Sequence, residues 1–559
     1  MPEERGSVLK KYAESGLCRL LLDMLRIPSV SPSPEHENRV TRLLYDTLAV
    51  LPYFREHPED LRLLPLEDDP FGRNFLFAFV RRPGPTAETV ILAGHADVVS
   101  AEACGELAPF AFDPEEYTRR LEDVALPEDA RRDLESGEWL FGRGVADMKS
   151  GLAAGIELLA EAASDPGSLG ANLLALAVPD EENNSAGMLA ASAQLARRQK
   201  EEGLRYRACI ELEPTFAGGE RALPSIYLGS IGKINTFFFC AGKETHVGEY
   251  YEGFGAAPVI SRINLELEGN PDYADSLDGR AYPPFGCMRQ TDLRREYSAT
   301  IMTRAFSFYS YLTATKLPGR ILGEMRAIAE KALREAIEAH ERNAESFAKM
   351  NGAGRSDAKW NSMALSYEEL RRMAEAKLGA GFPGFVEEVL SRTPSGADER
   401  TKAVALVESM VEACALPGPL VVFGFLPPWY PHRANLGLSE GERRVERAAR
   451  ETVREASERF GLTVETRPFF EGVSDLSYCG FQGEAGEMAT FAANMPGWKR
   501  LYSLPTEALA ELDIPILNFG PLGKDAHKNT ERLHLPYFME VFPKLLRSLV
   551  RRVAEDGER

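Results

Sequence analysis

The chain has 559 residues, of which 44% are hydrophobic and 27% are charged, a composition that is ordinary for a globular protein and excludes global disorder. Its 85 acidic and 65 basic side chains give a formal net charge of -20, so nucleic acid and anionic membrane surfaces would be repelled. No apolar stretch approaches the roughly 18 residues of a membrane-spanning helix, and we expect no secretion signal, no membrane contact and no nucleic-acid partner.

The first half of the chain alternates helical patterns with short apolar runs. Apolar residues recur at helical spacing over 37–52, 149–163 and 188–199. Strand-forming residues gather in 74–80, 89–94, 172–178 and 207–213. Near the other end, 513–520 reads as another short strand and 535–554 as an amphipathic helix. This alternation predicts an α/β fold in which a mainly parallel sheet is flanked by helices.

The middle of the chain has a different character. Residues 226–240 are aromatic and strand-like, whereas 270–300 and 351–365 are polar and rich in loop formers. Three charged helical patterns follow one another over 319–349, 366–378 and 399–415. We therefore expect an inserted α+β domain over 227–435, and an α/β domain made of residues 1–226 and 436–559.

Histidines and carboxylates follow several predicted strands of the α/β domain. These residues are His95 and Asp97 in VILAGHADVV, Asp147 in FGRGVAD, Glu181 and Glu182 in PDEE, Glu213 in ELEPT, and His527 in GKDAHKNT. Each has a structural alternative. His95 and Asp97 could share a hydrogen bond, Asp147 could cap a helix, and the adjacent acids could form a solvated loop.

Taken together, the same residues indicate a metal site. The carboxyl ends of strands in an open α/β sheet lie at one edge, where ligands gather. Three adjacent acids at 180–182 are costly to cluster without a cation. Imidazole and carboxylate donors without cysteine suit two divalent ions, zinc above all, with cobalt or manganese as alternatives.

The motifs resemble those of a known superfamily. GHADVV, GRGVADMKSG, PDEE, EPT and GPLGKDAHKNTE occur in the order of the co-catalytic di-zinc metallopeptidases, which include carboxypeptidase G2, aminoacylase, acetylornithine deacetylase and succinyl-diaminopimelate desuccinylase. LLLDMLRIPSVSPSPEHENRV and EGVSDLSYCG resemble the opening helix and the glycine-rich segment of that superfamily. The length and the long middle are most similar to the arginine-utilisation RocB branch. The resemblance implies a zinc-exopeptidase-like catalytic domain with an enlarged inserted lid.

The resemblance also implies which residues bind metal. His95 and Glu213 would bind one ion, and Glu182 and His527 would bind the other. Asp147 would bridge the two ions.

Further roles follow from the same resemblance. Asp97 would clamp the ring of His95, and Glu181 would be the general base. His246, in GKETHVG, would be a lid histidine that helps to hold the oxyanion and that can come from a partner subunit. Asn264 and Arg304 are candidates for binding the carboxylate of a substrate.

The activity expected from the resemblance is hydrolysis of an amide bond in an N-acyl amino acid or a short peptide by a metal-activated water. Two other interpretations stay open. The first is a non-enzymatic binding or scaffold protein on the same fold. The second is a phosphohydrolase, for which only Lys149, Lys524 and Lys528 lie near the motifs in sequence.

Compartment and assembly are further expectations. Seven cysteines without C-x-x-C spacing predict reduced, mostly buried thiols in a cytoplasmic protein, and neither a disulfide framework nor a zinc knuckle. The inserted domain offers a surface for a homodimer, although its size equally allows a monomer.

Overall fold

The chain divides into two compact units in a computed structural model that describes residues 7–215, 223–294, 297–352, 360–394 and 396–555. Unit 1 comprises Met1–Ile231, Arg433–Phe481 and Pro505–Arg559, and unit 2 comprises Gly232–His432 and Gln482–Leu504. Among the helices of the described residues, none combines the length and the apolar character that crossing a membrane requires.

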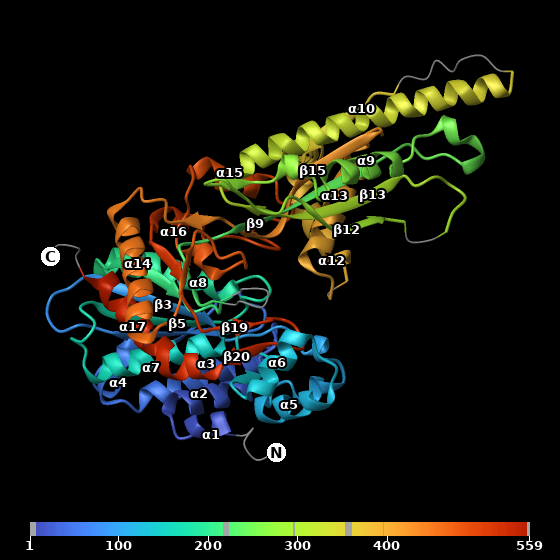
Figure 1. Cartoon of the computed structure of the whole chain (residues 1–559). Coiled ribbons are helices and arrows are strands. Elements are labelled where there is room, and N and C mark those ends of the chain that lie inside the picture. Colours follow the sequence, from blue (N-terminus) through green and yellow to red (C-terminus); the bar gives the residue numbers. More distant parts are fainter. Residues whose placement is uncertain (1–6, 216–222, 295–296, 353–359, 395, 556–559) are drawn as a thin grey trace. The chain divides into compact units, whose positions relative to one another are not determined.

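Unit 1 is built on a sheet in the strand order β1-β2-β5-β3-β6-β18-β7-β17. Figure 1 labels its strands β3 and β5. The central strands β5, β3, β6 and β18 run parallel, while β1 and β2 pair antiparallel at one edge. At the other edge β7 is antiparallel to β18 and parallel to β17. The strands are β1 (Leu61–Pro65), β2 (Asn74–Val80), β3 (Glu88–His95), β5 (Asn172–Val178), β6 (Arg205–Glu211), β7 (Ser225–Tyr227), β17 (Glu465–Arg467) and β18 (Ile516–Asn518). The predicted α/β class with a mainly parallel central sheet is confirmed.

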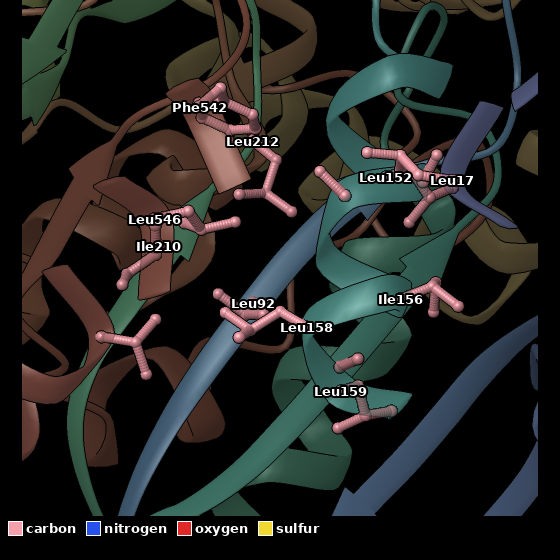
Figure 2. Packing of buried hydrophobic residues seen from close by; sticks show 14 of the residues in the cluster. Leu17, Leu92, Leu152, Ile156, Leu158, Leu159, Ile210, Leu212, Phe542 and Leu546 are labelled. Atoms are coloured by element: carbon pink, nitrogen blue, oxygen red, sulfur yellow. The ribbon is translucent and has the colours of Figure 1, made fainter. Parts of the chain in front are cut away.

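Helices cover both faces of this sheet. The helices of unit 1 are α1 (Ser7–Tyr12), α2 (Gly16–Leu25), α3 (Pro34–Ala49), α4 (Pro52–Glu56), α5 (Pro114–Arg120), α6 (Glu128–Ser136), α7 (Lys149–Ser164), α8 (Ala186–Glu202), α14 (Glu440–Phe460), α16 (Thr506–Glu511) and α17 (Phe542–Ala554). Of these, α5 and α6 pack against β4 (Trp139–Phe141), a strand of a smaller sheet. Figure 2 shows Ile156 of α7 and Leu546 of α17 in one apolar cluster with Leu92 of β3. On the opposite face, Arg198 of α8 lies over the ring of Phe77, 4.5 Å from its centroid. Strands covered on both faces are apolar throughout, which is why their sequences were recognisable.

Unit 2 is an α+β unit with a sheet in the order β12-β13-β9-β15-β14, antiparallel except for the β14–β15 pair. Its strands are β9 (Gly232–Ala241), β12 (Gly286–Asp292), β13 (Arg304–Thr313), β14 (Met363–Ser366) and β15 (Leu420–Tyr430). Its helices are α9 (Ala257–Leu267), α10 (Pro318–Met350), α11 (Tyr367–Leu378), α12 (Phe382–Arg392), α13 (Glu399–Cys414) and α15 (Ala485–Ala493). Phe237, Leu370 and Val407 join the sheet to α11 and α13 in one core.

The structure differs from the sequence-based expectation in two places. Residues 482–504, expected in the α/β domain, belong to unit 2, where the Gly319 amide donates to Glu487 over 2.7 Å. Within 270–300, expected as loop, β12 forms along the sheet edge, and its exposed polar residues carry no apolar pattern. Both differences arise from long-range pairing, which local composition does not encode.

Short strand pairs complete the fold. In unit 1, β4 (Trp139–Phe141) pairs with β20 (Arg532–His534), which also pairs with β19 (Gly523–Lys524). Two further pairs join β8 (Gly229–Ser230) to β16 (Arg433–Ala434) and β10 (Ser276–Leu277) to β11 (Arg280–Ala281). The β19–β20–β4 sheet matters for the site, because the loop between β19 and β20 carries His527 and the loop after β4 carries Asp147.

Candidate metal centre

The candidate metal-binding side chains of unit 1 lie together where strands end. His95 is the last residue of β3, Glu213 lies two residues beyond the end of β6, and Glu182 follows β5. Because β3, β5 and β6 are parallel neighbours, their carboxyl ends share one edge of the sheet. Asp147 and His527 reach this edge from the loops described above.

Asp147 occupies the middle of the group. Its Oδ1 lies 3.1 Å from His95 Nε2, and its Oδ2 lies 3.1 Å from His527 Nε2. A second carboxylate approaches each histidine, Glu213 at 3.0 Å from His95 Nε2 and Glu182 at 3.1 Å from His527 Nε2. Each oxygen of Asp147 therefore faces its own pair of one histidine and one carboxylate.

Asp147 does not cap the helix that follows it. Helix α7 begins at Lys149, and the residue in the N-cap position is Met148. A tight turn precedes it at Gly144, whose φ of +80° favours glycine and where a Cβ would lie 2.9 Å from Val98 Cγ1. The turn directs the Asp147 carboxylate to the two histidines, so capping does not explain this residue.

The donor set fits two divalent cations. Ligand atoms of His95, Glu181 and Glu213 lie within 4.8 Å of one another, and so do those of His95, Asp147 and Glu182. Donors held ~2.0–2.2 Å from a tetrahedral zinc ion lie roughly 3.3–3.6 Å apart, close to the spacings seen here. Glu213 Oε2 is buried without a hydrogen-bond partner among the described residues, which costs free energy unless a cation satisfies it.

Shifted pKa values show how the charges interact without a cation. Hydrogen bonds with Asp147 and Glu182 raise the pKa of His527 to about 10. Burial raises the pKa of Glu181, and burial and the charge of Asp147 raise the pKa of Glu213. Burial opposes ionisation of Asp147, yet hydrogen bonds with His527 and His95 hold its pKa below the usual range. Bound protons thus neutralise part of the negative charge of the carboxylates, which bound cations would otherwise neutralise.

Zinc is expected to stabilise the chain more at pH 8 than at pH 6. The raised pKa of His527 contributes stability to the metal-free protein that is fully present below about pH 6.5 and is lost as the pH rises towards 10. A cation must displace this proton, and displacement is easier when protons are scarce. Thermal unfolding with and without zinc at both pH values measures the effect. An equal increase in Tm at both values would contradict it.

Asp97 lies beside the His95 ring with both its backbone carbonyl and its carboxylate. His95 Nδ1 lies 3.0 Å from the backbone carbonyl of Asp97 but 3.6 Å from its carboxylate. With the Nδ1 proton donated to this carbonyl, Nε2 is the nitrogen that faces Asp147 and Glu213. The Asp97 carboxylate instead accepts hydrogen bonds from the amides of Glu181 (3.2 Å) and Glu182 (3.1 Å). It orders the loop that carries both glutamates.

Three of the candidate residues, His246, Asn264 and Arg304, belong to unit 2. His246 is exposed, and its Nδ1 accepts a hydrogen bond from the Gly248 amide over 3.1 Å. Arg304 forms salt bridges with Glu408 (2.7 Å) and Glu412 (2.5 Å), so internal partners occupy the guanidinium expected to bind a carboxylate. Tyr309 donates to the side-chain oxygen of Asn264 over 3.2 Å.

The three lysines near the motifs also have internal partners. Lys149 is buried and donates to the carbonyls of Met24 and Ile27 at the end of α2, at 3.0 and 2.8 Å. Lys524 pairs with Asp133 at 2.8 Å, and Lys528 pairs with Asp525 at 2.9 Å. A phosphohydrolase would need such cations for its substrate, so these contacts do not favour that interpretation.

Sequence reasoning assigned no role to several buried polar residues around the site. Glu531 accepts hydrogen bonds from the amides of Ala146 and Asp147, and burial raises its pKa to about 7. Glu211 accepts a hydrogen bond from the hydroxyl of Ser474, and burial raises its pKa to about 7 as well. Glu531 and Ser474 lie inside the quoted motifs, and this position was the feature of the sequence that could have marked them as site residues.

Comparison with known proteins identifies relatives along most of the chain. Residues 91–551 match the model of Peptidase family M20/M25/M40. The uncharacterized protein YqjN of Bacillus subtilis (strain 168) is 34% identical over 547 residues, 97% of each chain. Protein RocB of the same organism is 28% identical over 505 residues, 90% of this chain and 88% of RocB.

The similarity extends to solved structures. An M20 family metallo-carboxypeptidase from Sulfolobus solfataricus shares the fold with a TM-score of 0.52 at 12% identity, covering 96% of this chain and 99% of that one. The resemblance drawn from the motifs, including the RocB-like branch, is confirmed. The chain belongs to Peptidase family M20/M25/M40.

Proposed function

We propose that the chain is a metal-dependent hydrolase that cleaves the amide bond of an N-acyl amino acid or a short peptide. Its membership of a peptidase family supports hydrolysis of a peptide or amide bond. Metal dependence is supported above all by Asp147, whose two carboxylate oxygens face different histidines. Zinc is the cation we expect, with cobalt and manganese as alternatives for the same donors.

Five residues would hold the two cations. His95 and Glu213 would hold one, His527 and Glu182 the other, and Asp147 would contribute one oxygen to each. When bound, the pair would polarise the scissile carbonyl and lower the pKa of a water towards ~7. The carbonyl of Asp97 would keep the His95 ring oriented throughout.

Glu181 would act as the general base. Its carboxylate is buried, and its Oε2 lies 3.9 Å from His95 Nε2, beside the proposed cations. Other carboxylates lie closer to both histidines. Burial raises its pKa, which makes the carboxylate a stronger base than one in water. Glu181 would take a proton from the attacking water and then return it to the departing amine nitrogen.

His246 would donate to the developing oxyanion. Because its Nδ1 accepts the Gly248 amide proton, the proton of the neutral ring resides on Nε2, which is then the donor. Its exposure suits a residue that meets substrate.

Replacing His246 by alanine is expected to leave both cations bound and to lower kcat by about 100–1000-fold, the usual cost of one oxyanion donor. Steady-state kinetics and metal analysis of the same sample measure the two effects. His57→Ala, at an exposed histidine beside Glu59, serves as the matched control and should leave kcat and both ions of the proposed centre unchanged. Loss of a cation from His246→Ala would instead make this residue a metal ligand.

A substrate screen tests the proposed activity. The chain, stripped with a chelator and reloaded with zinc, cobalt or manganese, is incubated with N-acyl amino acids and dipeptides. Arginine-containing substrates are included because of the similarity to the RocB branch. We expect release of free amine only in the metal-loaded samples. Binding of two cations without turnover of any substrate would favour a binding or scaffold protein.

A further inference from the structure

Arg143 and Glu531 form a buried ion pair beside the candidate metal centre. Their side chains are 1% and 2% exposed, and Arg143 Nη1 lies 2.6 Å from Glu531 Oε2. Arg143 follows β4, and Glu531 directly precedes β20, so the pair joins two strands that are neighbours in the small sheet. The amide of Gly142 also donates to the carbonyl of Glu531 over 3.2 Å.

Each member of the pair holds the backbone of one proposed ligand. Glu531 Oε1 accepts hydrogen bonds from the amides of Ala146 (3.2 Å) and Asp147 (3.3 Å). Arg143 Nη2 donates to the backbone carbonyl of His527 over 3.2 Å. The ion pair therefore connects the backbone of the shared carboxylate directly to that of the second histidine.

His527 depends on such support more than the other candidates do. Its side chain is 51% exposed, whereas those of His95, Asp147 and Glu182 are 1%, 5% and 7% exposed. Its φ of +66° lies in the left-handed region, which non-glycine residues adopt only when their surroundings require it. Little packing orients this histidine, so contacts to its backbone must do so.

We propose that Arg143 and Glu531 are positioning residues that set the spacing between Asp147 and His527 and thereby the affinity for the cation held by His527 and Glu182. This inference rests on the proposed metal centre. Partners that orient metal ligands typically contribute about 10–100-fold to metal affinity. The cation held by His95 and Glu213 should respond less, because His95 ends β3 and Glu213 lies two residues beyond β6, away from the contacts of the ion pair.

Arg143→Lys is the more informative variant. Lysine keeps the positive charge next to Glu531 but has a single ammonium in place of the guanidinium fork that contacts both Glu531 and the His527 carbonyl. Glu531→Gln is the second variant, because a glutamine can accept from the Asp147 amide while its NH₂ group opposes Arg143. If one variant fails to fold, the other still decides the question.

Asp60→Asn provides the matched control. Asp60, at the end of a short 3₁₀ helix (Pro58–Asp60), is 1% exposed and pairs with Arg81 at 3.0 Å, so it too is a buried acid paired with an arginine. Arg81 follows Val80, which pairs with Leu173 near the start of β5, whereas the metal centre lies beyond the opposite end of that strand. This variant should lose stability without any change in the affinity for the two ions of the proposed metal centre.

Zinc titration of the chelator-treated full chain tests the proposal, using calorimetry for affinities, elemental analysis for stoichiometry and cobalt absorption spectra for ligand geometry. We expect both variants to bind one ion as wild type does and the other about 10–100-fold more weakly. Unchanged affinities for both ions, with only Tm lowered, would overturn the inference and leave the proposed hydrolase intact. Equal weakening of both ions would overturn it too. A wild-type chain that binds no ion would overturn the proposed function and this inference together.

Discussion

Glu181→Gln is expected to lower kcat by about 100–10,000-fold while both cations stay bound. Glutamine has the shape of glutamate but cannot take up a proton from water at neutral pH. Glu181 lies 3.9 Å from His95 Nε2, farther than Glu213 does, and Glu182 is the glutamate beside His527. Replacing Glu181 should therefore leave the proposed metal ligands in place. Kinetics with elemental analysis of the same preparation measure both results.

The neighbouring residue supplies the control for this experiment. Glu182 lies 3.1 Å from His527 Nε2, and Glu182→Gln should weaken binding of one cation, which Glu181→Gln should not. The two variants differ by one position in the chain and change the same functional group. Near-normal turnover in Glu181→Gln with full metal content would remove this residue from the role of general base.

Asp147→Asn is expected to disrupt binding of both proposed cations, because each oxygen of Asp147 faces a different histidine. Activity should fall by at least about 1000-fold, because the proposed activation of water depends on both ions. An asparagine offers one oxygen, and its NH₂ group cannot bind a cation. Zinc should then no longer raise the Tm of the chain. Elemental analysis and thermal unfolding with zinc measure the loss.

Asp113→Asn is a suitable control for this second substitution. The Asp113 side chain accepts from the Glu116 amide at the start of α5, a contact that an asparagine oxygen also makes. It should retain metal, activity and stability. If Asp147→Asn kept two cations and full activity, the bridging role would be wrong, and the hydrolase mechanism that depends on it would have to be abandoned.

Much of the fold was predictable from local patterns. The runs 74–80 and 172–178 are strands at those bounds because strands buried on both faces are apolar throughout. The pattern over 319–349 became α10 (Pro318–Met350), since a helix that buries one face repeats its apolar residues every three or four positions.

Other features could not be read from local patterns. The helices and turns of 102–136, between β3 and β4, form a small core around Tyr117 and Leu134, and the sequence analysis assigned no elements to this segment. Tyr117 also donates to the carbonyl of Asn529 over 2.7 Å, which links this segment to the loop that carries His527. Such a contact joins residues that are far apart in the sequence.

The amino-acid sequence by itself determined the fold class, the family and the set of candidate ligands, because burial and family motifs leave their pattern in short segments of the chain. Only the tertiary structure decided that the carbonyl of Asp97 faces the His95 ring, that the oxygens of Asp147 face different histidines, and that Arg143 pairs with Glu531. These features depend on the direction of individual atoms and on contacts across 388 positions of the chain. No local pattern of residue types records either property.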